Sequence, residues 1–368
     1  MPTDVEWADE TWNPLLGCFR ISGGCDFCYA IRTAKVRSGH PNRAVAEAFA
    51  GLVERRNGRL DWTGKINLME ERLTQPLRWR KPRKVFVNAL SDLFHDAVPV
   101  EFIARVFAVM AATPQHTYQI LTKRHGRMRS LLRDECQCHA SGTHFRSAME
   151  WAATPHSPTY VPGLRSGLHH RMTWPLPNVW IGVSVEDQKT ADLRIPALLE
   201  TPAAVRWLSM EPLIGPVDLF GEADAHGHRG WPTHWLTGRP TWGTEEAHPN
   251  GMVGRPLEVA PRVDWVVAGG ESGPGARPMK LQWARTVRDQ CVTAQVPFFF
   301  KQWGAWVPVS QMPEDTFMSW DIAHGTSAYD RDQPWRVGKK AAGRLLDERI
   351  WDEYPAALTG VAAAGEAA

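Results

Sequence analysis

The sequence contains no run of about eighteen apolar residues, which a membrane-spanning helix requires. Residues 1–9 are acidic and polar rather than basic and then apolar, so we expect no secretory signal. The sequence also lacks an excess of either charge, with 42 Lys and Arg against 40 Asp and Glu. This balance excludes a strong overall attraction to membranes or nucleic acids. The six cysteines form no wider disulfide framework, which is typical of a reducing compartment. We therefore expect a cytoplasmic protein with no membrane partner.

A Gly-x-Gly-x-x-Gly turn after an early strand is also missing, which disfavours a doubly wound dinucleotide-binding sheet. The chain instead alternates short apolar runs with segments of helical periodicity. The apolar runs cover residues 65–68, 84–90, 117–123, 179–185, 205–210, 264–269 and 297–301, and the helical segments cover residues 100–112, 188–199 and 281–294. A further strand ahead of residue 18 brings the count to about eight, the number of a full barrel. This alternation predicts an α/β fold with a parallel (β/α) barrel, closed or partial, of the TIM-barrel type.

The predicted domain organisation is one barrel over residues 1–355 with two long loop insertions. The insertions, at about residues 133–177 and 215–262, are rich in Pro, His, Gly or Trp and have no clear period. Residues 29–56 are expected to be helical with a break at His40-Pro41. Residues 356–368 are mostly Ala and Gly, too poor in large side chains to form a core, and are expected to be a disordered tail.

Three of the six cysteines lie on one short loop with C-x6-C-x2-C spacing: Cys18, Cys25 and Cys28. Glycines beside them permit the tight turns that would aim three sulfurs at one point. A structural zinc site needs four protein ligands, and the nearest downstream histidine, His40, lies twelve residues past Cys28. Three cysteines suit a 4Fe-4S cluster, because one iron then stays open to another ligand. We interpret the loop as a metal site, with a zinc knuckle or three free thiols as the alternatives.

This loop resembles the radical S-adenosylmethionine (SAM) superfamily, although its first cysteine gap is three residues longer than the usual C-x3-C-x2-C. Phe27 takes the position of the aromatic residue that packs near the adenine of SAM in that superfamily. The resemblance implies a 4Fe-4S cluster and SAM as cofactors. It also implies an electron donor such as flavodoxin or ferredoxin as a partner.

Polar residues follow six of the predicted strands. They are Ser91 and Asp92, then Thr122, Lys123 and Arg124, then Glu186 and Asp187, then Ser209 and Glu211, then Glu271 and Ser272, and last Lys301 and Gln302. Any one of them is as well explained by a solvated loop. Because the carboxyl ends of barrel strands meet at one mouth, their recurrence predicts a common pocket.

We expect the early and late strand ends to serve different purposes. Asn88, Ser91 and Asp92 occupy the early position at which the superfamily contacts SAM, and Thr122 and Lys123 follow on the next strand. With Phe27, these five strand-end residues are the expected cofactor contacts. The expected catalytic residues are Glu211, Glu271 and Lys301. A lysine between two carboxylates would stay charged, so we expect Lys301 to anchor a substrate. The Gly-Gly-Glu stretch at 269–271 comes later in the chain than its counterpart in the superfamily, so we do not equate the two.

Six segments, together spanning most of the chain outside the insertions, resemble a bacterial and bacteriophage family of uncharacterised proteins with a radical-SAM-like core. They cover residues 87–95, 120–124, 208–213, 269–273, 299–304 and 338–347. The resemblance implies fold and cofactor rather than a reaction. A phage-encoded protein would act in the cytoplasm of its host.

Three weaker signals remain. Cys136, Cys138 and His139 form a pattern that can bind zinc but is more common in flexible loops. Trp231, Trp235 and Trp242 can stack bases or form a satellite core. The basic residues within 123–129 can bind phosphate, or they can be the solvent-exposed start of a helix.

The leading hypothesis is a radical SAM-type enzyme that cleaves SAM reductively to a 5′-deoxyadenosyl radical and acts on an unknown substrate. The first alternative is a nucleotide- or nucleic-acid-modifying enzyme of phage origin, which leaves nucleic acid open as a partner. The second is a non-catalytic binding protein whose cysteine loop is held by zinc.

Overall fold

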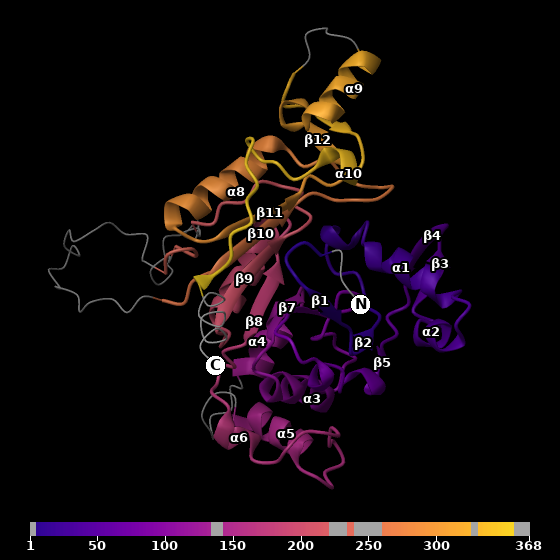
Figure 1. Cartoon of the computed structure of the whole chain (residues 1–368), viewed down its shortest axis with the longest axis vertical. Helices are drawn as coiled ribbons and strands as arrows, with labels where there is room; N and C mark the ends of the chain where they lie inside the picture. Colours follow the sequence, from indigo (N-terminus) through magenta and orange to yellow (C-terminus); the bar gives the residue numbers. More distant parts are fainter. Residues whose placement is uncertain (1–4, 134–142, 221–233, 239–259, 325–329, 357–368) are drawn as a thin grey trace, which may run out of the picture.

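A computed structural model describes residues 5–133, 143–220, 234–238, 260–324 and 330–356. Seven parallel strands form its central sheet in the order β1-β6-β7-β8-β9-β10-β11. They are β1 (Glu10–Trp12), β6 (Lys84–Val87), β7 (Thr117–Thr122), β8 (Val179–Ser184), β9 (Val205–Met210), β10 (Trp265–Gly269) and β11 (Phe298–Gln302). The sheet curls into half a barrel (Figure 1). The predicted α/β class and parallel sheet are confirmed, in the partial form rather than the closed one.

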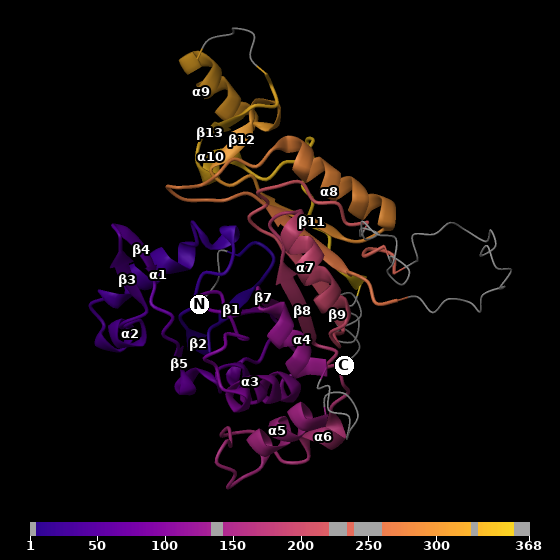
Figure 2. The same ribbon diagram turned by 180° about the vertical axis from the view of Figure 1, so that it is seen from behind.

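Helices cover the outer face of this sheet, as Figure 2 shows for α4, α7 and α8. The helices on this face are α3 (Val100–Ala112), α4 (His125–Arg133), α7 (Gln188–Leu199) and α8 (Leu281–Ala294). Asp187 is the N-cap of α7. Its side chain accepts a hydrogen bond from the backbone N–H of Thr190, and the hydroxyl of Thr190 accepts one from the backbone N–H of Asp187. Leu208 and Met210 of β9 point outward into the main core between sheet and helices.

The inner face of the half barrel is filled by aromatic rings. Trp207 of β9 points inward, and its indole lies over Gly182 of β8, where an added Cβ would be 2.4 Å from the ring. Trp7, from the segment before β1, completes this inner cluster at ring-centroid distances of 4.7 Å from Phe86 and 5.2 Å from Trp207. These rings bury a large apolar area, so the interior below the strand ends is a packed core rather than a channel.

A small lobe precedes the second strand of the sheet and carries the cysteine loop. It contains β2 (Leu15–Leu16), η1 (Gly23–Cys25), α1 (Tyr29–Ser38), α2 (Arg43–Ala48), β3 (Val53–Arg56), β4 (Arg59–Trp62) and β5 (Asn67–Leu68). The predicted strand at 65–68 exists only as β5, and it pairs antiparallel with β2 outside the main sheet, so its assignment as a barrel strand was wrong. This leaves seven strands in the sheet instead of about eight.

The helix predicted over residues 29–56 is also wrong at its end. α1 and α2 are separate helices, as the His40-Pro41 break predicts, but residues 53–56 form β3 of a hairpin. Asn57 and Gly58 both have positive φ at the hairpin turn, the conformation that an Asn-Gly pair favours.

The described part of the first insertion is partly helical. α5 (Thr143–Ala153) and α6 (Leu168–Arg171) pack against the outside of α3, with the rings of Phe107 and Phe145 5.1 Å apart. The remaining elements are η2 (Glu70–Arg72), η3 (Pro76–Arg78), β12 (Trp306–Pro308), η4 (Val309–Gln311), α9 (Glu314–His324), β13 (Pro334–Arg336) and α10 (Lys339–Ala342). Most of the second insertion, and the predicted tail beyond Ala356, lie outside the described residues.

The free side of β11 is covered by the last described segment of the chain. The backbone N–H of Phe300 donates to Trp351 O at 2.9 Å, and Phe299 and Asp352 form an isolated antiparallel bridge. This contact covers part of the edge of β11, where backbone N–H and C=O groups would otherwise be unpaired. None of the helices in the described ranges is long and apolar enough to cross a membrane.

Candidate functional site

The carboxyl ends of the sheet strands carry a buried polar layer that the cysteine loop covers. Asp92, after β6, is 4% exposed and accepts hydrogen bonds from Thr122 Oγ1 at 2.7 Å and from Arg124 Nη1 at 3.0 Å. The same guanidinium lies 3.8 Å from Cys18 Sγ and donates to Phe19 O at 3.4 Å. This ion pair therefore ties the ends of β6 and β7 to the first cysteine.

Glu186, after β8, ties the loop down at a second point. Its carboxylate accepts from Ser22 Oγ at 2.9 Å and from Arg194 Nη1 at 2.9 Å, and it forms a short contact with Lys123 Nζ. Burial raises the pKa of this carboxyl, but the charges of Lys123 and Arg194 and the hydrogen bonds outweigh it, so the pKa lies below its usual value. Glu186 is thus a buried anion with two cationic partners.

Gly24 allows the loop to approach that carboxylate closely. A Cβ added at Gly24 would lie 2.5 Å from both Cγ and Oε1 of Glu186, whereas one added at Gly23 would have its nearest neighbour 3.7 Å away. Glu186 is held by several partners and has little freedom to retreat. The loop therefore needs glycine at position 24 and tolerates a methyl group at position 23.

Glu271, after β10, meets the loop through an arginine. Arg277 donates from Nε to Glu271 Oε2 at 3.0 Å and again from Nη2, a bidentate pair, and it also donates from Nη2 to Gly23 O at 2.8 Å. Its guanidinium lies 5.4 Å from the centroid of the Phe27 ring. The ring itself packs on Gly275, where an added Cβ would lie 2.1 Å from it.

The structure brings together two of the three predicted catalytic residues. Lys301 Nζ lies 2.7 Å from Glu211 Oε2, at the ends of β11 and β9. Glu271 does not join them, because Arg277 takes its carboxylate. Of the three expected catalytic residues, only Lys301 and Glu211 therefore form an ion pair with each other.

The five expected cofactor contacts at the early strand ends also divide into two kinds. The hydroxyl of Ser91 donates to Leu15 O at 2.9 Å, and Asp92, Thr122 and Lys123 are engaged in the ion pairs and hydrogen bonds described above. Asn88 differs from these four: it is 4% exposed, has φ 63°, and neither its Nδ2 nor its Oδ1 has a hydrogen-bond partner in the described chain. A ligand or an ordered water can supply the partners that such a buried amide lacks.

All three loop cysteines are free thiols of intermediate exposure. Burial raises the pKa of Cys18 to about 12 and also raises the pKa of Cys28, so without a metal both favour the neutral thiol. Three thiols on a glycine-rich loop are a donor set that fits an iron–sulfur cluster. In the described residues, however, no three His, Cys, Asp or Glu side chains are already arranged around one metal position.

Ser22, Arg194 and Arg277 anchor the site but were missed in the sequence. Arg277 lies six residues beyond Glu271, just after a turn at residues 273–276, and Arg194 lies two helical turns into α7. Neither follows a strand directly, which was the signal that selected the other residues. Only the eight-residue spacing from Glu186 to Arg194, close to two helical turns plus the cap, hinted at a contact.

The weaker sequence signals do not add a site. Cys136, Cys138 and His139, with Trp231 and Trp242, lie outside the described residues. Trp235 is buried in the main core. In the basic cluster, Arg127 donates to His95 O and Val98 O, and Arg129 pairs with Glu200 at 3.1 Å, so these side chains are largely engaged within the fold.

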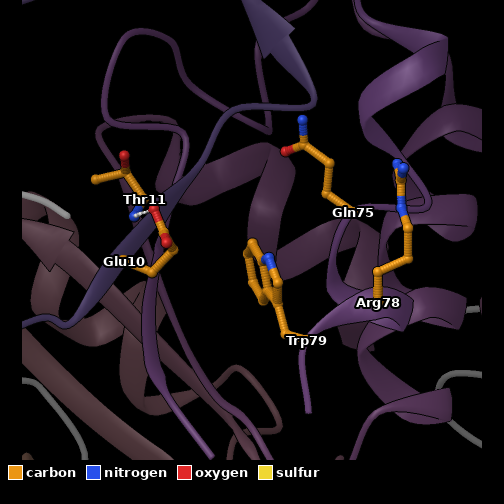
Figure 3. Close-up of a pocket in the computed structure, with 5 residues that line it drawn as sticks. All are labelled: Glu10, Thr11, Gln75, Arg78 and Trp79. Atoms are coloured by element: carbon orange, nitrogen blue, oxygen red, sulfur yellow. Dashed lines mark hydrogen bonds between the residues drawn. The ribbon is translucent and has the colours of Figure 1, made fainter. Parts of the chain in front are cut away.

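A cavity of ≈ 370 Å³ lies away from the cysteine loop. Glu10, Thr11, Gln75, Arg78 and Trp79 line it (Figure 3). Glu10 is the first residue of β1, so this cavity opens at the amino end of that strand. It therefore shares no residue with the layer at the carboxyl ends.

Comparison with known proteins identifies the family alone. No curated protein sequence and no solved structure matches the chain. A family model described as a protein of unknown function, DUF5131, matches residues 2–355. Because that match spans nearly the whole chain, the protein belongs to the uncharacterised DUF5131 family.

Proposed function

We propose that this protein is a radical SAM-type iron–sulfur enzyme, with a partial barrel of the TIM and radical SAM kind. Cys18, Cys25 and Cys28 would hold a 4Fe-4S cluster, and SAM would bind beside it. When bound, this pair would supply the difficult chemistry, reductive cleavage of SAM to a 5′-deoxyadenosyl radical that abstracts hydrogen from a substrate. The reductant would be a small electron carrier such as flavodoxin or ferredoxin.

One observation carries the proposal: the three-cysteine loop lies across the carboxyl edge of a parallel sheet. That edge is where barrel enzymes place their chemistry. Asp92 with Arg124, Glu186, and Arg277 each hold the loop from a different strand end, so the cysteines sit above the polar layer in a fixed position. A loop that served only as a structural knuckle would not need three separate anchors on that edge.

The roles of the remaining residues follow from their partners. Asn88, whose buried amide has both a donor and an acceptor to offer, is the best candidate to bind the polar groups of SAM. Phe27 remains the candidate contact for adenine. Lys301 and Glu211 neutralise each other at 2.7 Å, so they suit the anchoring of a polar substrate rather than proton abstraction.

Metal content after anaerobic purification and reconstitution with iron and sulfide tests the proposal. We expect about four irons per chain and visible charge-transfer absorption, the signature of one 4Fe-4S cluster. Stoichiometric zinc without iron would instead support a zinc-stabilised binding protein, and the proposal would be abandoned.

A further inference from the structure

Large apolar side chains are exposed in unusual density on the cysteine loop. The described residues expose twelve such side chains, and four of them fall within residues 19–29. They are Phe19, Ile21, Phe27 and Tyr29, which are 50%, 44%, 42% and 55% exposed. Four exposed apolar side chains within eleven residues of chain give this loop apolar surface that a partner can cover.

The lobe around this loop is also the basic part of the molecule. Residues 18–65, which we call the cysteine lobe, hold nine Lys and Arg against four Asp and Glu, a net charge of +5. The whole chain carries only +2, so the remaining residues are net negative. The positive field is therefore local to the lobe and would attract an anionic partner to it.

The aromatic and basic parts of the lobe are joined into one surface. Arg20 on the loop donates from Nε to Asp61 Oδ1 on β4 at 2.6 Å, and Arg59 on the same strand donates to Asp26 O on the loop. A Cβ at Gly64, just past β4, would lie 3.9 Å from the Phe19 ring. Figure 1 shows the β3–β4 hairpin and α1 together at this side of the molecule.

Several basic side chains of the lobe are available to bind phosphate groups. Arg32 and Lys35 are exposed on α1, and neither side chain makes a hydrogen bond or an ion pair with the described residues. Arg55 is exposed on the hairpin and donates only to Gly58 O within that part of the chain. Among the described residues, these three side chains form no ion pair that holds the fold together.

We propose that the cysteine lobe binds single-stranded nucleic acid, which, resting on the proposed function, makes a nucleic acid the substrate class of this enzyme. Unpaired bases can stack on exposed rings such as Phe19, while guanidinium and ammonium groups neutralise the backbone. Duplex bases are already stacked on one another and cannot use those rings. An acidic protein would have to supply both carboxylates and an apolar surface, whereas every nucleotide carries a phosphate and a base together.

Fluorescence anisotropy with a labelled single-stranded oligonucleotide tests this inference. We expect Phe19→Ala to weaken binding about 5- to 150-fold, because one stacked base is worth about 1–3 kcal/mol. The double variant Lys35→Gln, Arg55→Gln should weaken binding several-fold and flatten its dependence on salt. Trp151→Ala, which removes an even more exposed ring on α5, and Lys189→Gln, which removes an exposed charge on α7, should bind like the unmodified protein.

Two results would overturn the inference. One is a lack of binding at about 100 μM protein in low salt, below even non-specific affinity. The other is equal displacement by polyglutamate together with an unaffected Phe19→Ala variant, which would indicate an acidic protein partner. Iron is measured on the same samples, so an iron-free protein that binds the oligonucleotide would count against the proposed function alone.

Discussion

Lys301 and Glu211 form an ion pair that spans β10, with Lys301 Nζ 2.7 Å from Glu211 Oε2. The second carboxylate oxygen accepts from Trp7 Nε1 at 3.4 Å. Ninety residues separate the two partners in the chain, so only the parallel order of β9, β10 and β11 brings them to one edge. Both side chains are largely buried, and Lys301 Nζ has a second, more distant carboxylate partner, Glu6 Oε2, at 4.0 Å.

Glu211→Gln and Lys301→Met should abolish turnover of the true substrate while leaving iron content and reductive SAM cleavage largely intact. The pair makes none of the contacts by which Arg124, Glu186 and Arg277 hold the cysteine loop. Release of 5′-deoxyadenosine in the absence of substrate is the measurement, with Lys189→Met, an exposed lysine on α7, as the control. Equal loss of this uncoupled cleavage in both variants would mean that the pair serves the cofactor.

Cys25→Ala and Cys28→Ala should each lose the bound iron, whereas Cys291→Ala should retain it. Cys291 is fully buried on α8, on the outer side of the sheet, and is remote from the loop. Iron and sulfide analysis after reconstitution distinguishes the variants. Loss of iron from Cys291→Ala alone would show that the ligand assignment is mistaken.

Gly24→Ala and Gly23→Ala form a matched pair on the loop. The methyl group at position 24 would meet Glu186 at 2.5 Å, so we expect this variant to lose about 1–3 kcal/mol in the free energy of unfolding. At position 23 the nearest atom would be 3.7 Å away, and we expect a change within about 0.5 kcal/mol. Urea unfolding measures both, and equal losses would show that Glu186 does not constrain the loop.

The stability contributed by Asp347 should depend on pH. Hydrogen bonds from Arg285, chiefly, and from Arg288 lower the pKa of this carboxyl from 3.8 to about 2. Because the folded pKa is the lower one, the stabilisation is present above about pH 4 and is lost as pH falls toward 2.

Asp347→Asn should therefore lower the free energy of unfolding by about 1–2 kcal/mol at pH 7, after allowance for partial exposure, and by less at pH 3. Asparagine keeps the shape and tolerates the positive φ of 53° at this position. Urea unfolding of both proteins at pH 7, 5 and 3 gives the difference. A difference that stays constant with pH would rule out the ion pair as its origin.

Elements with strong local signals could be predicted from the sequence. α3, α7, α8 and β9 have the bounds that helical periodicity and apolar runs predicted, since both patterns depend on residues that are close together in the sequence. Residues 53–56 were misjudged because a short charged segment carries no such stripe, and the Asn-Gly turn after it decides its conformation. The run at 65–68 became β5 because β2, some fifty residues earlier, was there to pair with it.

The sequence by itself determined the spacing of the three cysteines, the parallel alternation of the sheet and the polar residues that end its strands. Only the tertiary structure decided which charges meet: Glu271 takes Arg277 and not Lys301, and Glu186 takes Lys123, Arg194 and the loop hydroxyl of Ser22. The physical reason is that a buried carboxylate pairs with whichever cation lies within hydrogen-bond distance in space. That distance depends on the curl of the sheet and the path of the loop above it, which no local pattern in the sequence encodes.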